Sequence, residues 1–184
     1  MKSKWMLLAL PLFLSACGYN TIQTMDETAA AAKQQIEVQL QRRADLVPNL
    51  VETVKGYAKQ ESTVFIAVAE ARAGLAGAVQ GGNVGTMATA NEAMTGALGR
   101  LLAIAENYPQ LKSDQNFLRL QDELTGTENR IAVARTDYNN AVRDYNAYIR
   151  RFPQVLTAKV TSAKSREYFE VTNAAAKEAP KVKF

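Results

Sequence analysis

Few side chains in this sequence belong to types that carry reaction chemistry. The 184 residues include no His and a single Cys, Cys17. Without His, the sequence lacks the usual ligand sets for zinc and the base of Ser-His or Cys-His nucleophile pairs. A single Cys also excludes an intrachain disulfide, so Cys17 is a free thiol, a cross-link to another chain or a modified residue. We predict no metal site, no cofactor and no catalytic residues.

The residues before Cys17 favour its modification. Lys2 and Lys4 precede an apolar run from Trp5 to Leu14, about half as long as a helix needs to cross a bilayer. This is the layout of a secretory leader. The four residues LSAC that end at Cys17 resemble the bacterial lipobox, in which diacylglycerol alkylates the thiol before cleavage on its N-terminal side. The alternative is a plain leader or short anchor with an incidental Cys.

The lipobox predicts where the protein is held. Residues 1–16 would be removed as a signal peptide, and the acyl chains on Cys17 would insert into membrane lipid. The expected location is the cell envelope, on the periplasmic face of a membrane. Gly18 stands where an Asp would be the usual inner-membrane retention signal, which favours the outer membrane in a Gram-negative cell.

The charge balance argues against a nucleic-acid partner. The chain has 22 basic and 18 acidic residues, and removal of Lys2 and Lys4 with the leader leaves 20 against 18. A nearly neutral mature chain offers no broad cationic surface for neutralising phosphates.

The densest group of charges lies at Arg42, Arg43 and Asp45, followed by Pro48 and Asn49. These residues form a possible interaction site, because Arg makes bidentate contacts with anionic headgroups and carboxylates. The favoured interpretation is structural: Asp45 caps a helix, and the two Arg side chains satisfy neighbouring carbonyls or carboxylates.

Two further groups are interpreted mainly as structural. Aromatic residues at helical spacing form a stripe near one helix end, which is expected to be core more than a ligand groove; its members are Tyr138, Tyr145, Tyr148 and Phe152. Glu61 and Arg72 lie about three helical turns apart, so both are expected to face the interior and to pair with other charges.

The elements that must position these residues are helices. Apolar residues spaced alternately three and four apart define helical seams over residues 22–40, 47–78, 87–108 and 117–148. Short connections between them predict an all-α, antiparallel up-and-down four-helix bundle with long helices, over residues 17–173. Residues 174–184, rich in Lys and Ala, are expected to be a loose tail.

Turn residues set the expected helix ends. Gly81, Gly82 and Asn83 separate the second and third helices, while Pro109 stops the third and Ser113-Asp114 can cap the fourth. The fourth ends before Phe152-Pro153, with a short extra turn possible between residues 153 and 161. We expect a kink or break near residues 43–47, with Pro48 in the first turn of a new helix.

A family resemblance rests on several motifs. The stretch QLQRRADLVPNLV at residues 39–51 is followed by Glu70-Ala71-Arg72, and later by Tyr-Asn at 138–139 and 145–146 and Phe-Pro at 152–153. These resemble the LemA family of bacterial envelope proteins over nearly the whole mature chain. The resemblance implies an antiparallel four-helix bundle and no established catalytic activity. Family members usually carry an N-terminal transmembrane helix, so the lipobox changes the anchor.

Two functions remain open. The first is a non-enzymatic envelope lipoprotein that acts as a scaffold or interaction module, with membrane lipid and an envelope protein as partners. The alternative is a carrier that holds a lipid or another apolar ligand between its helices. The oligomeric state does not follow from the sequence.

Overall fold

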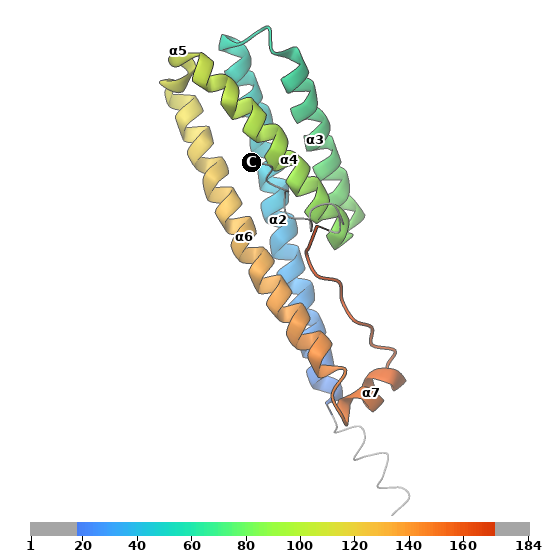
Figure 1. Ribbon diagram of the computed structural model, residues 1–184. Helices are drawn as coiled ribbons and strands as arrows, with labels where there is room; N and C mark the ends of the chain where they lie inside the picture. The colour runs from blue at the N-terminus through green and yellow to red at the C-terminus, as the bar shows by residue number, and fades with distance from the viewer. Residues whose placement is uncertain (1–17, 172–184) are drawn as a thin grey trace, which may run out of the picture. The chain divides into compact units, whose positions relative to one another are not determined.

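The structure, a computed structural model, describes residues 18–171 (Figure 1). The predicted leader 1–16, Cys17 and the predicted tail 174–184 lie outside the described residues. Within them the structure contains helices and turns but no strand, so the predicted all-α class is confirmed. The described residues form six helices in place of the four predicted: α2 (Tyr19–Tyr57), α3 (Ser62–Gly81), α4 (Val84–Asn107), α5 (Pro109–Lys112), α6 (Gln115–Tyr148) and α7 (Gln154–Val160).

The chain divides into two compact units, which are described separately. The first unit contains the described residues up to Gln35 and residues 134–168. The second contains residues 36–133 and the described residues from Phe169 onward. Both long helices, α2 and α6, therefore contribute one part to each unit.

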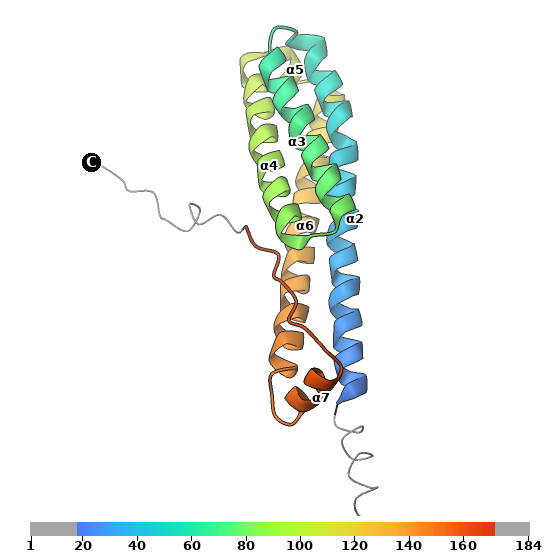
Figure 2. The ribbon, with the colours of Figure 1, turned by 90° about the vertical axis from the view of Figure 1, so that its right-hand side faces the viewer.

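In the second unit, segments of α2, α3, α4 and α6 lie side by side (Figure 2). Their inward positions are those of the predicted seams: the residues less than 2% exposed include Leu50, Val54, Val68, Met94 and Leu101. Burial of such apolar side chains is the main term that stabilises the unit. Seam spacing thus identified most of the core correctly.

The turn between α3 and α4 follows the prediction. Gly82 has a φ of 66°, in the left-handed region that favours glycine, and its N–H donates to the carbonyls of Ala78 and Val79. Asn83 then caps α4, because its side-chain oxygen accepts the N–H of Thr86 at 2.8 Å. These two residues reverse the chain direction in a minimal connection.

The start of α6 is also fixed as the sequence predicts. Pro109 opens the short helix α5, and Asp114 Oδ1 accepts the backbone N–H groups of Asn116 and Phe117 at 2.9 Å each. The hydroxyl of Tyr57 donates to the other carboxylate oxygen of Asp114 at 2.9 Å, which ties the last residue of α2 to this cap.

Of the kink or break predicted near residues 43–47, the break is wrong. α2 continues through Pro48 to Tyr57, and the chain leaves helical geometry at residues 58–61 instead. Asp45 is therefore not a helix cap, and the seam predicted over residues 47–78 belongs to two helices. Glu61, predicted as an inward seam residue, immediately precedes α3.

A side chain from α3 explains how α2 passes through Pro48. Proline has no N–H to donate to the carbonyl of Ala44, four residues earlier, and this bond is normally lost when a helix contains proline. Here the Nε–H of Arg72 donates to that oxygen at 2.9 Å. Because Ala44 is buried, leaving its carbonyl without this donor would be costly. Arg72 therefore contacts a backbone group in place of the charged partner predicted for it.

α3 has a further property that concerns membranes. Among the described helices it alone is long and apolar enough to cross a bilayer by length and composition, with a mean hydropathy of 1.3 over 18 residues. About a fifth of that segment (22%) is buried. Its buried residues are Phe65, Val68, Leu75 and Ala78, and it packs along α4.

The first unit is built from the beginning of α2, the end of α6, and α7. Ile22, Tyr145, Ile149 and Ala158 form its buried cluster. α6 ends at Tyr148, and α7 occupies the region of the predicted extra turn. Residues 161–168, called the strap from here on, continue from α7 along α2 and α6 (Figures 1 and 2).

The link between Pro48 and Arg72 is testable by a double-mutant cycle. Arg72→Ala is expected to lower the free energy of unfolding by about 1 to 2 kcal/mol, because it leaves a buried carbonyl unpaired. In a Pro48→Ala background the new N–H satisfies that carbonyl, so the same change should cost about 1 kcal/mol less. Urea unfolding followed by circular dichroism provides the measurement. Equal costs in both backgrounds would contradict this account.

Candidate functional site

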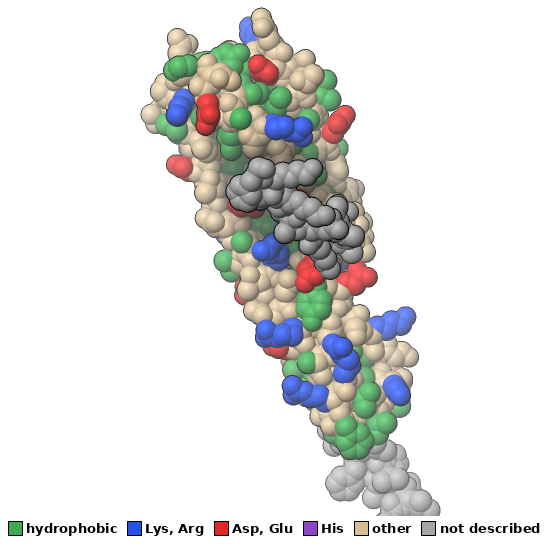
Figure 3. Space-filling model, in the orientation of Figure 1, with side chains coloured by type: hydrophobic (Ala, Val, Ile, Leu, Met, Phe, Trp, Pro, Cys, Tyr) green, Lys and Arg blue, Asp and Glu red, His purple; other side chains and the backbone are tan. Residues whose placement is uncertain are grey.

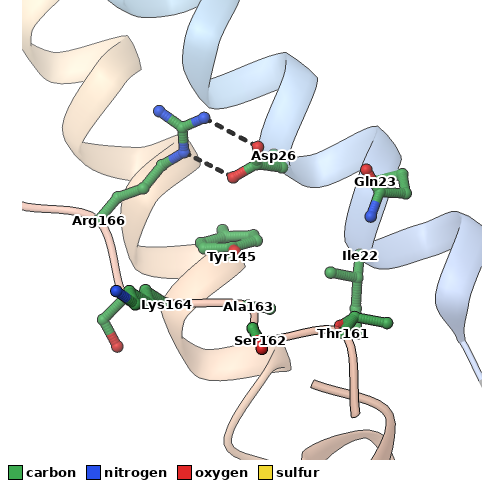
Figure 4. Close-up of a pocket in the computed structure, with 10 residues that line it drawn as sticks. Ile22, Gln23, Asp26, Tyr145, Thr161, Ser162, Ala163, Lys164 and Arg166 are labelled. Carbon is green, nitrogen blue, oxygen red and sulfur yellow. Dashed lines mark hydrogen bonds and ion pairs between the residues drawn. The ribbon is translucent and has the colours of Figure 1, made fainter. Parts of the chain in front are cut away.

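No metal centre is formed by the described side chains: none of them make a group of three or more His, Cys, Asp or Glu residues able to hold an ion. The most developed polar site is instead a cavity of about 410 Å³ in the first unit (Figure 4). It is lined by α2 and α6 and by the strap, through Ile22, Gln23, Asp26, Tyr145 and residues 161–166.

An ion pair forms one wall of this cavity. The Nε–H and an Nη2–H of Arg166 donate to the two carboxylate oxygens of Asp26 at 2.7 and 2.9 Å. This bidentate geometry is the strongest form of the Arg-carboxylate contact. The hydrogen bonds from Arg166 hold the pKa of Asp26 below its ordinary value of 3.8, against the opposing effect of partial burial. Asp26 in turn raises the pKa of Arg166.

Tyr145 completes the polar wall. Its side chain lines the cavity together with Asp26, and the ring is buried beside Ile22. Burial raises the pKa of Tyr145, and the neighbouring negative charge of Asp26 raises it further. The phenol is therefore a neutral donor at physiological pH.

Backbone contacts fix the strap to α6. The side-chain amide of Asn146 donates to the carbonyl of Arg166 and accepts the N–H of Arg166, each at 2.9 Å. The hydroxyl of Tyr138 donates to the carbonyl of Glu167 at 2.7 Å. These three bonds give the extended strap the backbone partners that a sheet would otherwise supply. The two Tyr-Asn motifs seen in the sequence thus contribute Tyr138, Tyr145 and Asn146 to one structure.

The chemistry available in this cavity is recognition and positioning. Both oxygens of Asp26 already accept hydrogen bonds from a guanidinium, so the carboxylate is held as an ionised acceptor and is poorly placed to take a proton at neutral pH. Ser162, at the start of the strap, has a φ of 56°, in the left-handed region that is uncommon for residues other than glycine. The strap is therefore held in one conformation by specific bonds.

The five residues predicted near Pro48 do not converge. Arg43 is buried, whereas Arg42, Asp45 and Asn49 are exposed and Pro48 is half-buried. Asp45 accepts a hydrogen bond from the side chain of Gln41 on the same helix at 2.9 Å. The carbonyl of Asn49 accepts the Thr53 hydroxyl.

Arg43 joins three helices inside the second unit. Its Nη1 lies 2.6 Å from Asn91 Oδ1 on α4 and 2.6 Å from Glu128 Oε2 on α6. Burial lowers the pKa of Arg43, and the nearby charge of Glu128 opposes that effect. The Nε atom of Arg43 is buried without a hydrogen-bond acceptor. A buried charge with partners on two other helices specifies the register in which the helices pack. This role is favoured over binding of an external ligand.

The predicted aromatic stripe separates into two parts. Tyr138 and Tyr145 are buried, and Tyr148 packs beside the buried cluster. Phe152 does not join them, because α6 ends at Tyr148 and the next residues turn away from the helical spacing; its side chain is 80% exposed.

Sequence reasoning missed Asp26 and Arg166, and also Asn91 and Glu128. Asp26 lies one turn after the buried Ile22 on α2, which was a usable signal for a charge that pairs with another segment. Arg166 offered none, because it lies 140 residues away in a segment without periodicity.

Comparison with known proteins agrees with this arrangement of motifs. Residues 32–184 match the LemA family, a range that includes the Pro48 region, Arg72 and the strap. The chain belongs to the LemA family. The resemblance stated from the sequence motifs is therefore confirmed.

Three related proteins are named as magnetosome proteins. MamQ 1 and MamQ 2 of Paramagnetospirillum magneticum are each 31% identical to this chain, over 83% of the chain and 64% of the relative. MamQ of Magnetospirillum gryphiswaldense is 32% identical, over 82% of the chain and 64% of the relative. The LemA chain described here thus spans about 64% of the length of these curated relatives.

Arg43 and its neighbour Arg42 provide a matched pair of variants. Arg43→Ala should lower the free energy of unfolding by about 2 kcal/mol or more, because Asn91 and Glu128 lose a buried partner. Arg42→Ala, at an exposed site on the same helix, should change it by less than about 0.5 kcal/mol. Chemical unfolding followed by circular dichroism measures both, and similar effects of the two changes would refute the bridging role.

The ion pair of the first unit predicts a pH dependence. Asp26 has a depressed pKa in the folded protein, so its contribution to stability is present above the unfolded-state pKa near 3.8 and is lost as the pH falls through the lower folded-state value. Asp26→Asn should lower the free energy of unfolding by about 1 kcal/mol at pH 7. It should also flatten the acid limb, which is the fall in that free energy at low pH measured by urea unfolding across a pH series. Glu27→Gln, an exposed neighbour, should leave the limb intact. An unchanged limb in Asp26→Asn would count against the pair.

Proposed function

We propose that this LemA protein is a non-enzymatic scaffold or interaction module of the bacterial cell envelope, anchored to a membrane by acyl chains on Cys17. In this proposal residues 1–16 are removed as a signal peptide. The second unit acts as an up-and-down four-helix bundle whose outer faces meet an envelope protein partner.

The observation that carries the proposal is the short distance in sequence between the lipobox and the folded chain. Cys17 is followed by Gly18, and α2 begins at Tyr19. Gly18 has a φ of 89°, and a Cβ there would lie 2.5 Å from the Tyr148 hydroxyl, so this residue is packed against the first unit. An acylated Cys17 would therefore have almost no spacer and would place the first unit at the bilayer.

The charged side chains of the two described clusters are held by specific partners, which supports a structural role. In the described cavity of the first unit, Asp26 is bonded to Arg166, and in the second unit Arg43 is bonded to Asn91 and paired with Glu128. Long helices of 39 and 34 residues, α2 and α6, suit a spacer. We further propose, from the relatives named as magnetosome proteins, that the chain serves at a cell membrane.

The location follows from the same leader. We place the protein on the periplasmic face, and in a Gram-negative cell we favour the outer membrane, because Gly18 takes the position at which Asp would retain a lipoprotein in the inner membrane.

The carrier alternative has less support. A lipid-sized ligand needs a large apolar cavity. The cavity at Asp26 has polar and charged walls, and a second cavity, of about 280 Å³ beside Phe117 and Leu102 in the second unit, also contains Glu106 and Lys112. Neither cavity favours the carrier function over the scaffold function.

The anchor is tested by maturation of Cys17 variants in the native cell. Wild-type protein should give a mature N-terminus whose mass includes diacylglycerol, in the membrane fraction. Cys17→Ser should accumulate as the uncleaved precursor, because the hydroxyl is not alkylated. Ser15→Ala, which keeps a small residue before the cut, should mature normally. Intact-protein mass spectrometry is the measurement, and normal cleavage of Cys17→Ser would refute lipid anchoring.

A further inference from the structure

The short helix α7 is oriented unusually for a helix at a water-exposed surface. Its small residue Ala158 packs into the buried cluster of the first unit. Of its three larger apolar residues, Val155 is half-buried, whereas Leu156 and Val160, four positions apart and so on one face, are 43% and 86% exposed. An amphipathic helix in a soluble protein normally buries its larger apolar side chains.

A third apolar side chain lies at the same corner. Phe152, in the turn between α6 and α7, is 80% exposed. We call Phe152, Leu156 and Val160 the apolar tip. Single exposed apolar residues need no explanation, but three within nine residues of one short segment mark a contact surface.

Basic side chains surround the apolar tip. Arg150, Arg151, Lys159 and Lys164 are all exposed, and residues 149–165 contain no acidic side chain. Figure 3 shows Lys and Arg side chains gathered with hydrophobic ones over the α7 end of the first unit. This combination has the composition of interfacial segments that bind anionic bilayers.

The chain enters the fold beside this surface. Gly18 lies against Tyr148, the last residue of α6, and Gln154, the first residue of α7. Phe152 lies in the five-residue stretch between those two contacts. A lipid attached at Cys17 would therefore hold the apolar tip close to the headgroups.

We infer that Phe152, Leu156 and Val160, framed by Arg150, Arg151, Lys159 and Lys164, form a second membrane contact that inserts among the headgroups of an anionic bilayer. The inference rests on the proposed anchor for its placement, and on exposure and charge for its chemistry. Acyl chains and a basic apolar surface are the two kinds of signal that together make membrane attachment stable. The tether raises the local concentration of lipid, so even a weak contact is occupied.

A tryptophan at the tip provides the test. Trp5 is the only tryptophan in the sequence, so Trp5→Phe with Phe152→Trp leaves one reporter whether or not the leader is removed. The full chain is purified and reconstituted into vesicles of phosphatidylethanolamine and phosphatidylglycerol, with and without doxyl-labelled lipid. The tryptophan at position 152 should shift its emission to the blue and be quenched by the doxyl lipid.

A matched control uses another exposed site in the same unit. Gln35 lies on α2, 16 residues after Tyr19 and therefore about 24 Å along the helix. Trp5→Phe with Gln35→Trp should show no quenching. Circular dichroism of both variants checks that the helices are intact.

Charge variants test the contribution of the basic side chains around the apolar tip. Adding Arg151→Gln, Lys159→Gln and Lys164→Gln to the position-152 reporter should weaken vesicle contact by on the order of fivefold for each charge removed. The loss should appear with phosphatidylglycerol and largely vanish in vesicles of phosphatidylcholine alone.

The outcomes separate this contact from the anchor. If the chain floats with vesicles but position 152 is no more quenched than position 35, the tip contact is wrong and the anchor stands. If the chain does not float with membranes, the anchor is wrong. In that case, quenching of position 152 on mixing the free chain with anionic vesicles would still support the membrane contact of the apolar tip. No quenching would reject both the anchor and the tip contact. Emission that shifts with protein concentration but not with doxyl lipid would identify a protein-binding surface and overturn the inference.

Discussion

The ion pair between Asp26 and Arg166 is the interaction on which the first unit depends. It joins residues 140 positions apart, and with Asn146 and Tyr138 it holds the strap on α2 and α6. The strap continues directly from α7, so the same bonds decide where α7 lies. α7 presents Leu156 and Val160 outward, and Phe152 is exposed in the turn just before it. The first residue of α7, Gln154, lies against Gly18. The ion pair and the strap contacts therefore determine the position of the surface that we propose contacts the membrane.

Much of the fold could be predicted because it obeys local rules. Period and spacing identified Val54, Met94 and Leu101 as core, since a helix repeats its inward face every three to four residues. Gly82, Asn83 and Asp114 ended or began helices as their side chains and backbone freedom require. These residues act on neighbours within one turn, so the sequence alone contains the relevant partners.

The failures around Pro48 and the missed ion pairs share one physical cause, which is a partner distant in the sequence. Pro48 predicts a break only if the carbonyl of Ala44 stays unpaired, and Arg72 removes that condition from another helix. Asp45 then has no helix end to cap. Arg43 meets Asn91 and Glu128, and Asp26 meets Arg166, through contacts that no periodicity marks. The family motifs were informative because they include residues whose partners lie far away in the sequence. These residues are Arg43, Pro48, Arg72, Tyr138 and Asn146.

The proposed function draws on both units. The second unit supplies rigid helices cross-linked by Arg43 and Arg72, and the first unit supplies a strapped end beside the proposed lipid site. The central claim is that the strap fixes α7 in place, and hydrogen-deuterium exchange of the purified chain with and without Arg166→Gln tests it most directly. The account predicts exchange about tenfold faster over residues 154–168, with α3 and α4 unchanged. Equal exchange of residues 154–168 in the two proteins would contradict it.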